Sequence, residues 1–174
     1  TRNFEKAPKS RVRGAVRLNG ESATPTLAEE ILHPGKGRIR SLMISGANPV
    51  GAIPDTDKVV EAFRALDLLV VVEPFETATS LLADYVLPPK ILFEHADFTF
   101  GLEMTNLSLP YTQYTPPLVP PPQDSELCDE GYVAWAITKR LGGTLNIMGV
   151  DMDMENPPSD DDILAIMARN SSVP

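Results

Sequence analysis

The chain has 174 residues, of which 43% are hydrophobic and 22% charged, and its formal net charge is −9. These values are typical of a soluble globular protein with a full-sized core, and no apolar run approaches the ~20 residues of a membrane-spanning helix. The single cysteine, Cys128, excludes a disulfide framework and a thiolate cluster for zinc or iron–sulfur. His33 and His95 have no metal-ligand spacing. With no signal-peptide pattern, we expect a mature soluble chain or an excised piece of a longer one.

Residues 1–25 are punctuated by proline and glycine and are predicted to be an irregular lead-in. The first 17 residues hold six basic side chains against Glu5 alone, which leaves −14 for the rest of the chain. A basic arm of this kind is found in nucleic-acid-binding proteins. No aromatic residues interleave here and the body is acidic, so we interpret the arm as a solvated segment and expect no nucleic-acid partner.

The first regular elements are predicted from caps and apolar periodicity. Thr26 is placed to cap a short helix, Leu27–Leu32, whose Glu29 and Glu30 lie in the positive first turn. A His-Pro-Gly stop then leads into an apolar strand, Ile39–Ser45.

A loop and a helix are predicted next. The loop, Gly46–Asp55, is expected to be held extended by its two prolines. Thr56 or Asp57 then caps a helix that ends near Leu66 and has one apolar face.

Alternation of strand and helix continues to residue 89. Leu68–Val72 is an apolar, largely β-branched run that suits a strand buried on both faces. A short helix around Thr79–Ala83 precedes a third strand, Tyr85–Leu87, which two prolines stop. This order predicts a Rossmann-like α/β fold: an open, mostly parallel sheet with helices on both faces in three αβα layers.

The second half begins with a proline-rich strap at residues 108–123. Six prolines between Pro110 and Pro122 exclude regular structure, and Leu118 and Val119 are expected to dock on the domain. A polyproline ligand for a signalling module is the alternative interpretation of this segment.

Two helices are predicted after the strap. The first spans Glu130–Leu141 and ends at Gly142, and the second runs from Asp160 to about Arg169. Ser159 caps this last helix and forms a capping box with Asp162. The acidic segment 151–155 lacks the pattern of a calcium loop and is interpreted as a solvated turn. The residues expected to face the core from the first helix are Tyr132, Val133, Ala136, Ile137 and Leu141.

Small and polar residues follow the predicted parallel strands, at the sheet edge where open α/β folds bind ligands. Gly46 permits close approach of a phosphate or ribose, and Asn48 offers both a donor and an acceptor. Glu73 ends the second strand, where an acidic residue accepts hydrogen bonds from ribose hydroxyls, and burial in the core is not expected there. Thr77 and Thr79 suit a phosphate or pterin oxygen. A plain turn at Gly46 and helix caps at the two threonines are the alternatives.

Three stretches of this chain resemble the nucleotide-binding middle domain of the molybdopterin oxidoreductases, the dimethyl-sulfoxide-reductase and formate-dehydrogenase superfamily. GRIRSLMISGANPVGAIPD resembles the family's strand with its G-x-N-P loop. LDLLVVVEPFETATSLLADYVLP resembles its strand, acidic residue, T-x-T turn and A-D-x-V-L-P block, and EGYVAWAITKRLG resembles its closing helix. The blocks follow the family's order, and the similarity spans about residues 10–170.

This resemblance implies a molybdopterin-guanine-dinucleotide-binding domain at residues 26–174. It implies that Asn48 contacts the guanosine part of the cofactor and that Val72 and Glu73 hold its guanine and ribose, with Glu73 where the family usually has aspartate. His95 and Glu130 match further polar contacts. The sequence around His95 lacks the glycine of the dehydrogenases' E-x-x-G, which leaves the substrate open.

The resemblance also implies what lies elsewhere in the parent enzyme. The molybdenum ligand and the iron–sulfur cluster belong to regions outside this segment, so no catalytic residue is expected here and Cys128 is interpreted as packing. The expected partners are the rest of a bacterial parent polypeptide, including a C-terminal barrel, and a second copy through an exposed apolar patch. A cytoplasmic location is expected, with the periplasm as the alternative. A metal-free scaffold domain of a respiratory complex and a stand-alone nucleotide-binding domain are the alternative functions.

Overall fold

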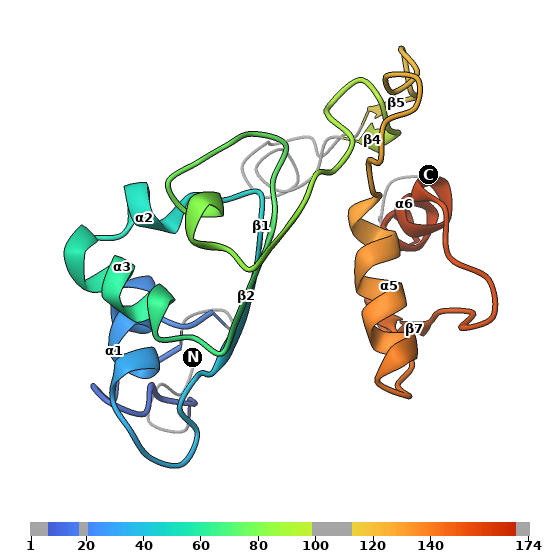
Figure 1. The fold of residues 1–174 in the computed structure, drawn as a ribbon. Coiled ribbons are helices and arrows are strands. Elements are labelled where there is room, and N and C mark those ends of the chain that lie inside the picture. Colours follow the sequence, from blue (N-terminus) through green and yellow to red (C-terminus); the bar gives the residue numbers. More distant parts are fainter. Residues whose placement is uncertain (1–6, 18–20, 99–112, 170–174) are drawn as a thin grey trace. The chain divides into compact units, whose positions relative to one another are not determined.

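The computed structural model of the chain describes residues 7–17, 21–98 and 113–169. The chain forms two compact units, Thr1–Leu87 and Pro88–Pro174 (Figure 1). The boundary falls inside the span 26–174 that the sequence favours as one domain. Within the described residues, no helix has both the length and the apolarity that crossing a membrane requires.

The first unit is built on a three-stranded parallel sheet. Its strands are β1 (Ser41–Ser45), β2 (Leu68–Val72) and β3 (Tyr85–Leu87), in the order β1-β2-β3. Ser45 is in register with Val72, and Val72 with Leu87, so all three strands end at the same edge. The predicted open parallel α/β sheet is therefore confirmed, although β1 begins two residues later than expected.

Helices α1, α2 and α3 lie on one side of this sheet (Figure 1). A single apolar cluster fills the space between them and the strands, with Ile31 from α1, Phe63 from α3 and Ile44, Leu69 and Val71 from the sheet. Burial of this cluster is the main favourable contribution to the unit's stability. The helical elements are η2 (Thr24–Thr26), α1 (Leu27–Leu32), α2 (Pro49–Ala52), α3 (Thr56–Arg64) and η3 (Ser80–Leu82).

The other face of the sheet carries a row of apolar side chains that remain accessible. Met43, Val70 and Tyr85 are cross-strand neighbours in the register of the three strands. Met43 is 43% exposed and Tyr85 63% exposed, while Val70 is half-buried. The second helical layer that the sequence predicts is therefore not formed by the described residues of this unit, and β2 is fully covered on one face only.

The loop after β1 differs from its prediction. Pro49 does not hold the chain extended but occupies the first position of α2, where a proline ring suits helical geometry and its missing N–H costs nothing. Asp55, and not Thr56 or Asp57, caps α3: its backbone is left-handed (φ +64°) and its side chain accepts from the Lys58 N–H. Aspartate tolerates this conformation better than most residues do.

The basic arm is not simply solvated, because two of its arginines bind α1. Arg11 donates to the carbonyls of Glu30, His33 and Pro34 and so satisfies the carboxyl end of the helix. Arg13 makes a two-pronged ion pair with the buried Glu29. Thr26 also differs from its prediction, since its hydroxyl donates to the Ala23 carbonyl within η2 instead of capping α1.

The contacts of Glu29 predict a loss of stability in acid. Hydrogen bonds from Arg13 and then Lys58 lower the pKa of Glu29 from 4.5 to about 2. Since the folded-state pKa lies below the unfolded value, the stabilisation is fully present above pH ~4.5 and is lost as the pH falls towards about 2. Thermal unfolding of Glu29→Gln should therefore change less than that of the natural chain between pH 6 and pH 3. An equal pH dependence in both proteins would contradict this role.

The second unit contains two helices and two small antiparallel ladders. Ser159 caps helix α6 and forms the predicted capping box with Asp162, which is confirmed. Gly142 follows α5 in a left-handed conformation (φ +72°), as expected for a helix end. The elements are β4 (Asp97–Phe98), β5 (Tyr114–Thr115), α5 (Glu130–Arg140), β6 (Asn146–Ile147), β7 (Val150–Asp151) and α6 (Asp160–Ala168).

The buried face of α5 is centred on Trp135, which the sequence analysis does not place in the core. Val133 and Ala136 are buried as expected, but Tyr132, Ile137 and Leu141 are exposed. The Trp135 indole N–H donates to the Asp153 carbonyl (2.7 Å), so this large side chain both fills the core and ties down the acidic turn.

The described part of the proline-rich strap, residues 113–123, is largely irregular, as predicted, apart from β5. It is held through its backbone: the N–H groups of Leu118 and Val119 both donate to the Phe93 carbonyl. Their side chains stay exposed, so the expectation that they dock on the domain is wrong. Residues 108–112 of the strap lie outside the described residues.

Candidate functional site

The carboxyl ends of the three strands in the first unit bring several predicted site residues together. The Gly46 N–H, directly after β1, donates to the Val72 carbonyl (3.0 Å). The Glu73 N–H, directly after β2, donates to the Leu87 carbonyl (3.2 Å). Gly46 and Glu73 therefore continue the parallel ladder by one residue and lie at the edge that favours ligand binding.

The backbone conformation at position 46 requires a glycine. Its φ of +59° lies in the left-handed region, which disfavours residues with a Cβ atom. A Cβ built at this position meets no atom within 4 Å, so the space above the backbone is open. A ligand atom can approach the strand end there.

Asn48 and Thr79 connect the two loops that follow β1 and β2. The Asn48 Oδ1 atom accepts from the Thr79 hydroxyl (2.7 Å) and from the Thr79 N–H (3.2 Å). Asn48 is exposed, whereas Thr79 is completely buried. The G-x-N-P loop and the T-x-T turn are thus parts of one structure, although 31 residues separate the two side chains.

Glu73 is more buried than a residue at a strand end is expected to be, with 9% of its surface exposed. Its Oε1 atom accepts from the Phe75 N–H (3.2 Å), so the carboxylate folds back over its own loop. The side chain of Val72 is fully buried, and its carbonyl is occupied by Gly46. Any contact of Val72 with a ligand is therefore confined to its backbone.

Thr77 forms a local cap at the start of η3. The Ser80 N–H donates to the Thr77 hydroxyl oxygen (3.1 Å), and the Thr77 N–H donates to the Ser80 hydroxyl oxygen (2.8 Å). This reciprocal pair agrees with the capping interpretation of Thr77.

Asp84 is hydrogen-bonded to the central strand of the sheet. Its Oδ2 atom accepts from the Leu69 N–H (2.7 Å), and its own N–H donates to the Leu69 carbonyl (2.9 Å). These bonds join the start of β3 to β2.

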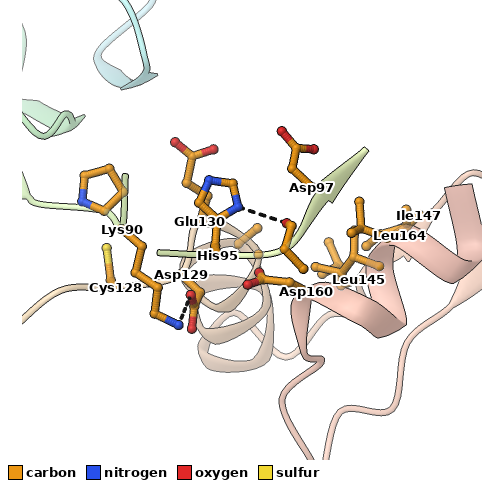
Figure 2. Close-up of a pocket in the computed structure, with 15 residues that line it drawn as sticks. Lys90, His95, Asp97, Cys128, Asp129, Glu130, Leu145, Ile147, Asp160 and Leu164 are labelled. Carbon is orange, nitrogen blue, oxygen red and sulfur yellow. Dashed lines mark hydrogen bonds and ion pairs between the residues drawn. The ribbon is translucent and has the colours of Figure 1, made fainter. Parts of the chain in front are cut away.

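The remaining two predicted residues, His95 and Glu130, line one pocket of the second unit (Figure 2). The pocket has a volume of about 390 Å³, within the range of small-molecule sites. His95 Nδ1 lies 2.9 Å from the Ala96 carbonyl oxygen, which fixes the imidazole ring. Glu130 is the first residue of α5.

The charged side chains that line this pocket beside His95 are mostly acidic. Its one lysine, Lys90, forms an ion pair with Asp129 (2.7 Å), which raises the pKa of the lysine (Figure 2). Burial, followed by the nearby Asp129 carboxylate, raises the pKa of Asp160. Cys128 also lines the pocket, and burial raises the pKa of its thiol, so it is a poor nucleophile.

Sequence reasoning did not find this pocket because its charged groups come from separate segments. Lys90 follows a proline pair, Asp129 precedes α5, and Asp160 begins α6. No spacing rule connects them, since only the packing of α6 beside α5 and residues 89–97 brings them together.

The sequence profile of the family described as "Molybdopterin oxidoreductase" matches residues 14–126. The chain belongs to this family. The match includes both strand-end loops of the first unit, and hence Gly46, Asn48, Glu73 and the two threonines. The family is named for a molybdenum–pterin cofactor, so the predicted cofactor class is supported at this level.

Three curated relatives of this chain are identical to it at about a third of the aligned positions. "Probable oxidoreductase YyaE" of Bacillus subtilis is 32% identical over 117 residues, covering 67% of this chain and 17% of that protein. "F420-dependent formate dehydrogenase subunit alpha" of Methanocaldococcus jannaschii is 35% identical over 120 residues (69% and 16%). "Trimethylamine-N-oxide reductase" of Haemophilus influenzae is 32% identical over 103 residues (52% and 12%). The chain thus spans less than a fifth of each of these relatives.

Proposed function

We propose that the first unit holds the guanosine part of a molybdopterin guanine dinucleotide, as a segment of a larger molybdenum oxidoreductase. The observation that carries the proposal is the edge formed by Gly46, Asn48 and Glu73, which lies within the span that matches the family. When bound, the cofactor supplies two-electron redox chemistry, whereas this chain's residues bind and orient its nucleotide end.

The groups at this edge fit a nucleotide. The open space above Gly46 accommodates a phosphate or ribose next to the backbone. Asn48 is exposed and supplies a neutral polar side chain beside it. The described contacts of Glu73 use only Oε1, which leaves the second carboxylate oxygen for ribose hydroxyls.

His95 and Glu130 are proposed as further cofactor contacts, of a different chemical kind. Carboxylates outnumber Lys90 in their pocket, so a phosphate group would be repelled there. The pocket is better suited to N–H or O–H donors, such as the amino groups of a pterin or guanine ring.

The apolar row Met43, Val70 and Tyr85 also fits a segment of a larger protein. Because each matched relative is several times longer than this chain, we propose that other parts of the parent polypeptide cover this sheet face.

The nucleotide assignment is tested by thermal unfolding of the chain with GDP and with ADP. A ligand at 100 times its Kd stabilises the folded state by about 2.7 kcal/mol, so GDP should raise the Tm by several degrees and ADP by less. Glu73→Ala should reduce the GDP shift to about half or less, because the loss of the ribose contact weakens binding. The exposed Glu76 on the same loop provides the control, and Glu76→Ala should keep it. Equal shifts with GDP and ADP would refute the guanosine site.

A further inference from the structure

The hydrogen bonds between Asn48 and Thr79 determine which way the Asn48 carboxamide faces. A backbone N–H can only donate, so the Asn48 atom that faces the Thr79 N–H must be the oxygen. The Val50 N–H donates to the Thr79 hydroxyl oxygen (3.1 Å), and the single hydroxyl proton then goes to Asn48 Oδ1 (2.7 Å). Asn48, Thr79 and Val50 thus form a closed ring of hydrogen bonds, called the Asn48 ring below. The direction of each bond in it follows from which atoms can donate and which can accept.

The Asn48 ring uses the full acceptor capacity of Asn48. A carboxamide oxygen has two lone pairs, and Thr79 occupies both of them. The Nδ2 group must point away from Thr79, and within the described residues it has no protein acceptor. The sequence-based expectation that Asn48 offers both a donor and an acceptor is thereby narrowed to a donor.

Gly51 provides a second, independent observation on the same group. A Cβ atom at Gly51 would lie 3.0 Å from Asn48 Nδ2, closer than an ordinary van der Waals contact. Gly51 is exposed, so no core packing requires a glycine there. A side chain at this position would require the Nδ2 group to shift by a few tenths of an ångström.

We propose that Thr79 is a positioning residue that holds Asn48 as a donor-only group at the strand edge. The ligand atom that Asn48 meets must then be an acceptor, such as a phosphate oxygen or a purine carbonyl. Thr79 has no exposed surface and acts through Asn48, not by touching the ligand itself. This inference rests on the proposed nucleotide function for its ligand, but the geometry of the Asn48 ring is testable without one.

The first test compares Thr79→Val, which removes the hydroxyl at nearly constant shape, with Thr79→Ser, which keeps it. In the ligand-free chain, hydrogen exchange of the Val50 amide should accelerate about tenfold or more in the valine variant and return towards normal in the serine variant. The NMR signals of the Asn48 side-chain amide should shift in the valine variant only. Unchanged exchange and unchanged signals in Thr79→Val would overturn the proposal.

The second test measures the Kd for GDP. Thr79→Val should weaken binding about tenfold and Thr79→Ser little, since one hydrogen bond positions the donor. Asn48→Asp keeps an oxygen for Thr79 but replaces the donor with a carboxylate, so it should retain Val50 protection and lose GDP binding. The buried Thr26 donates to Ala23 elsewhere in the unit, so Thr26→Val should lower the Tm without changing this Kd.

The outcomes separate this inference from the proposed function. If the natural chain binds GDP no better than ADP, the guanosine site is refuted. The role of Thr79 in holding Asn48 is then tested only by the Val50 amide exchange and the Asn48 side-chain signals of the ligand-free chain. If the natural chain binds GDP and Thr79→Val binds it equally well, the positioning role is overturned while the guanosine site stands. Failure of Thr79→Ser to restore binding would likewise overturn the role of the hydroxyl.

Discussion

Leu69→Ala is expected to lower the free energy of unfolding of the first unit by about 2–5 kcal/mol. Leu69 is 1% exposed, lies on the central strand β2, and belongs to the cluster between the sheet and its helices. The truncation removes buried apolar surface and leaves a cavity. Because β2 lies between β1 and β3, the backbone cannot move in to fill this cavity. Urea unfolding followed by circular dichroism measures the loss.

Met43→Ala provides the matched control on the opposite face of the same sheet. Because Met43 is partly accessible, its truncation should cost less than about 1 kcal/mol. Equal losses for the two variants would contradict the description of a sheet covered by helices on one face only, and would indicate that the Met43 row is buried in an association of copies.

A second large effect, on the Kd for GDP, is expected when the ribose hydroxyls of the ligand are removed. If Glu73 accepts their hydrogen bonds, the natural chain should bind GDP about 10- to 150-fold more tightly than the dideoxy analogue, which lacks both hydroxyls. This range follows from hydrogen bonds to a charged acceptor, which contribute about 1.5–3 kcal/mol.

Glu73→Ala should remove that discrimination, so that GDP and its dideoxy analogue bind with equal Kd. Isothermal titration gives the Kd of both ligands for both proteins. These four values form a thermodynamic cycle that isolates the interaction between the Glu73 carboxylate and the ribose hydroxyls. A preference for GDP that persists in Glu73→Ala would assign the ribose contact to another residue.

The parallel sheet could be predicted from the sequence because its signals are local. The apolar runs of β2 and β3 and their proline stops fix the strands, and the helices between them impose parallel pairing. The Ser159–Asp162 capping box was equally predictable, since both partners lie within one turn.

Pairings between distant segments were not predictable in the same way. Arg13 and Glu29 form their ion pair only once the arm folds back on α1. The exposed side of α5 was misjudged because the periodicity also fits other faces, and Trp135 gains more from burial than Tyr132 does. The sequence predicts that Pro49 holds its loop extended, but a proline is equally suited to the first position of a helix, where the structure places it.

At the candidate site, the sequence identifies the residue types correctly but not what each side chain does. Asn48, Glu73 and Thr79 were all expected to face a ligand from one sheet edge. The structure instead gives Thr79 the task of holding Asn48, and ties one oxygen of Glu73 to the backbone of Phe75. These different roles depend on how exposed each side chain is in the folded chain, and a local sequence pattern does not encode that exposure.

The central claim, a guanosine site at the strand ends of the first unit, is tested most directly by mapping GDP onto the chain with amide NMR spectra. GDP should shift the signals of residues 46–48 and 73–79 in a saturable manner, and ADP should shift them less at the same concentration. Shifts confined to other residues, or equal shifts with ADP, would contradict the claim.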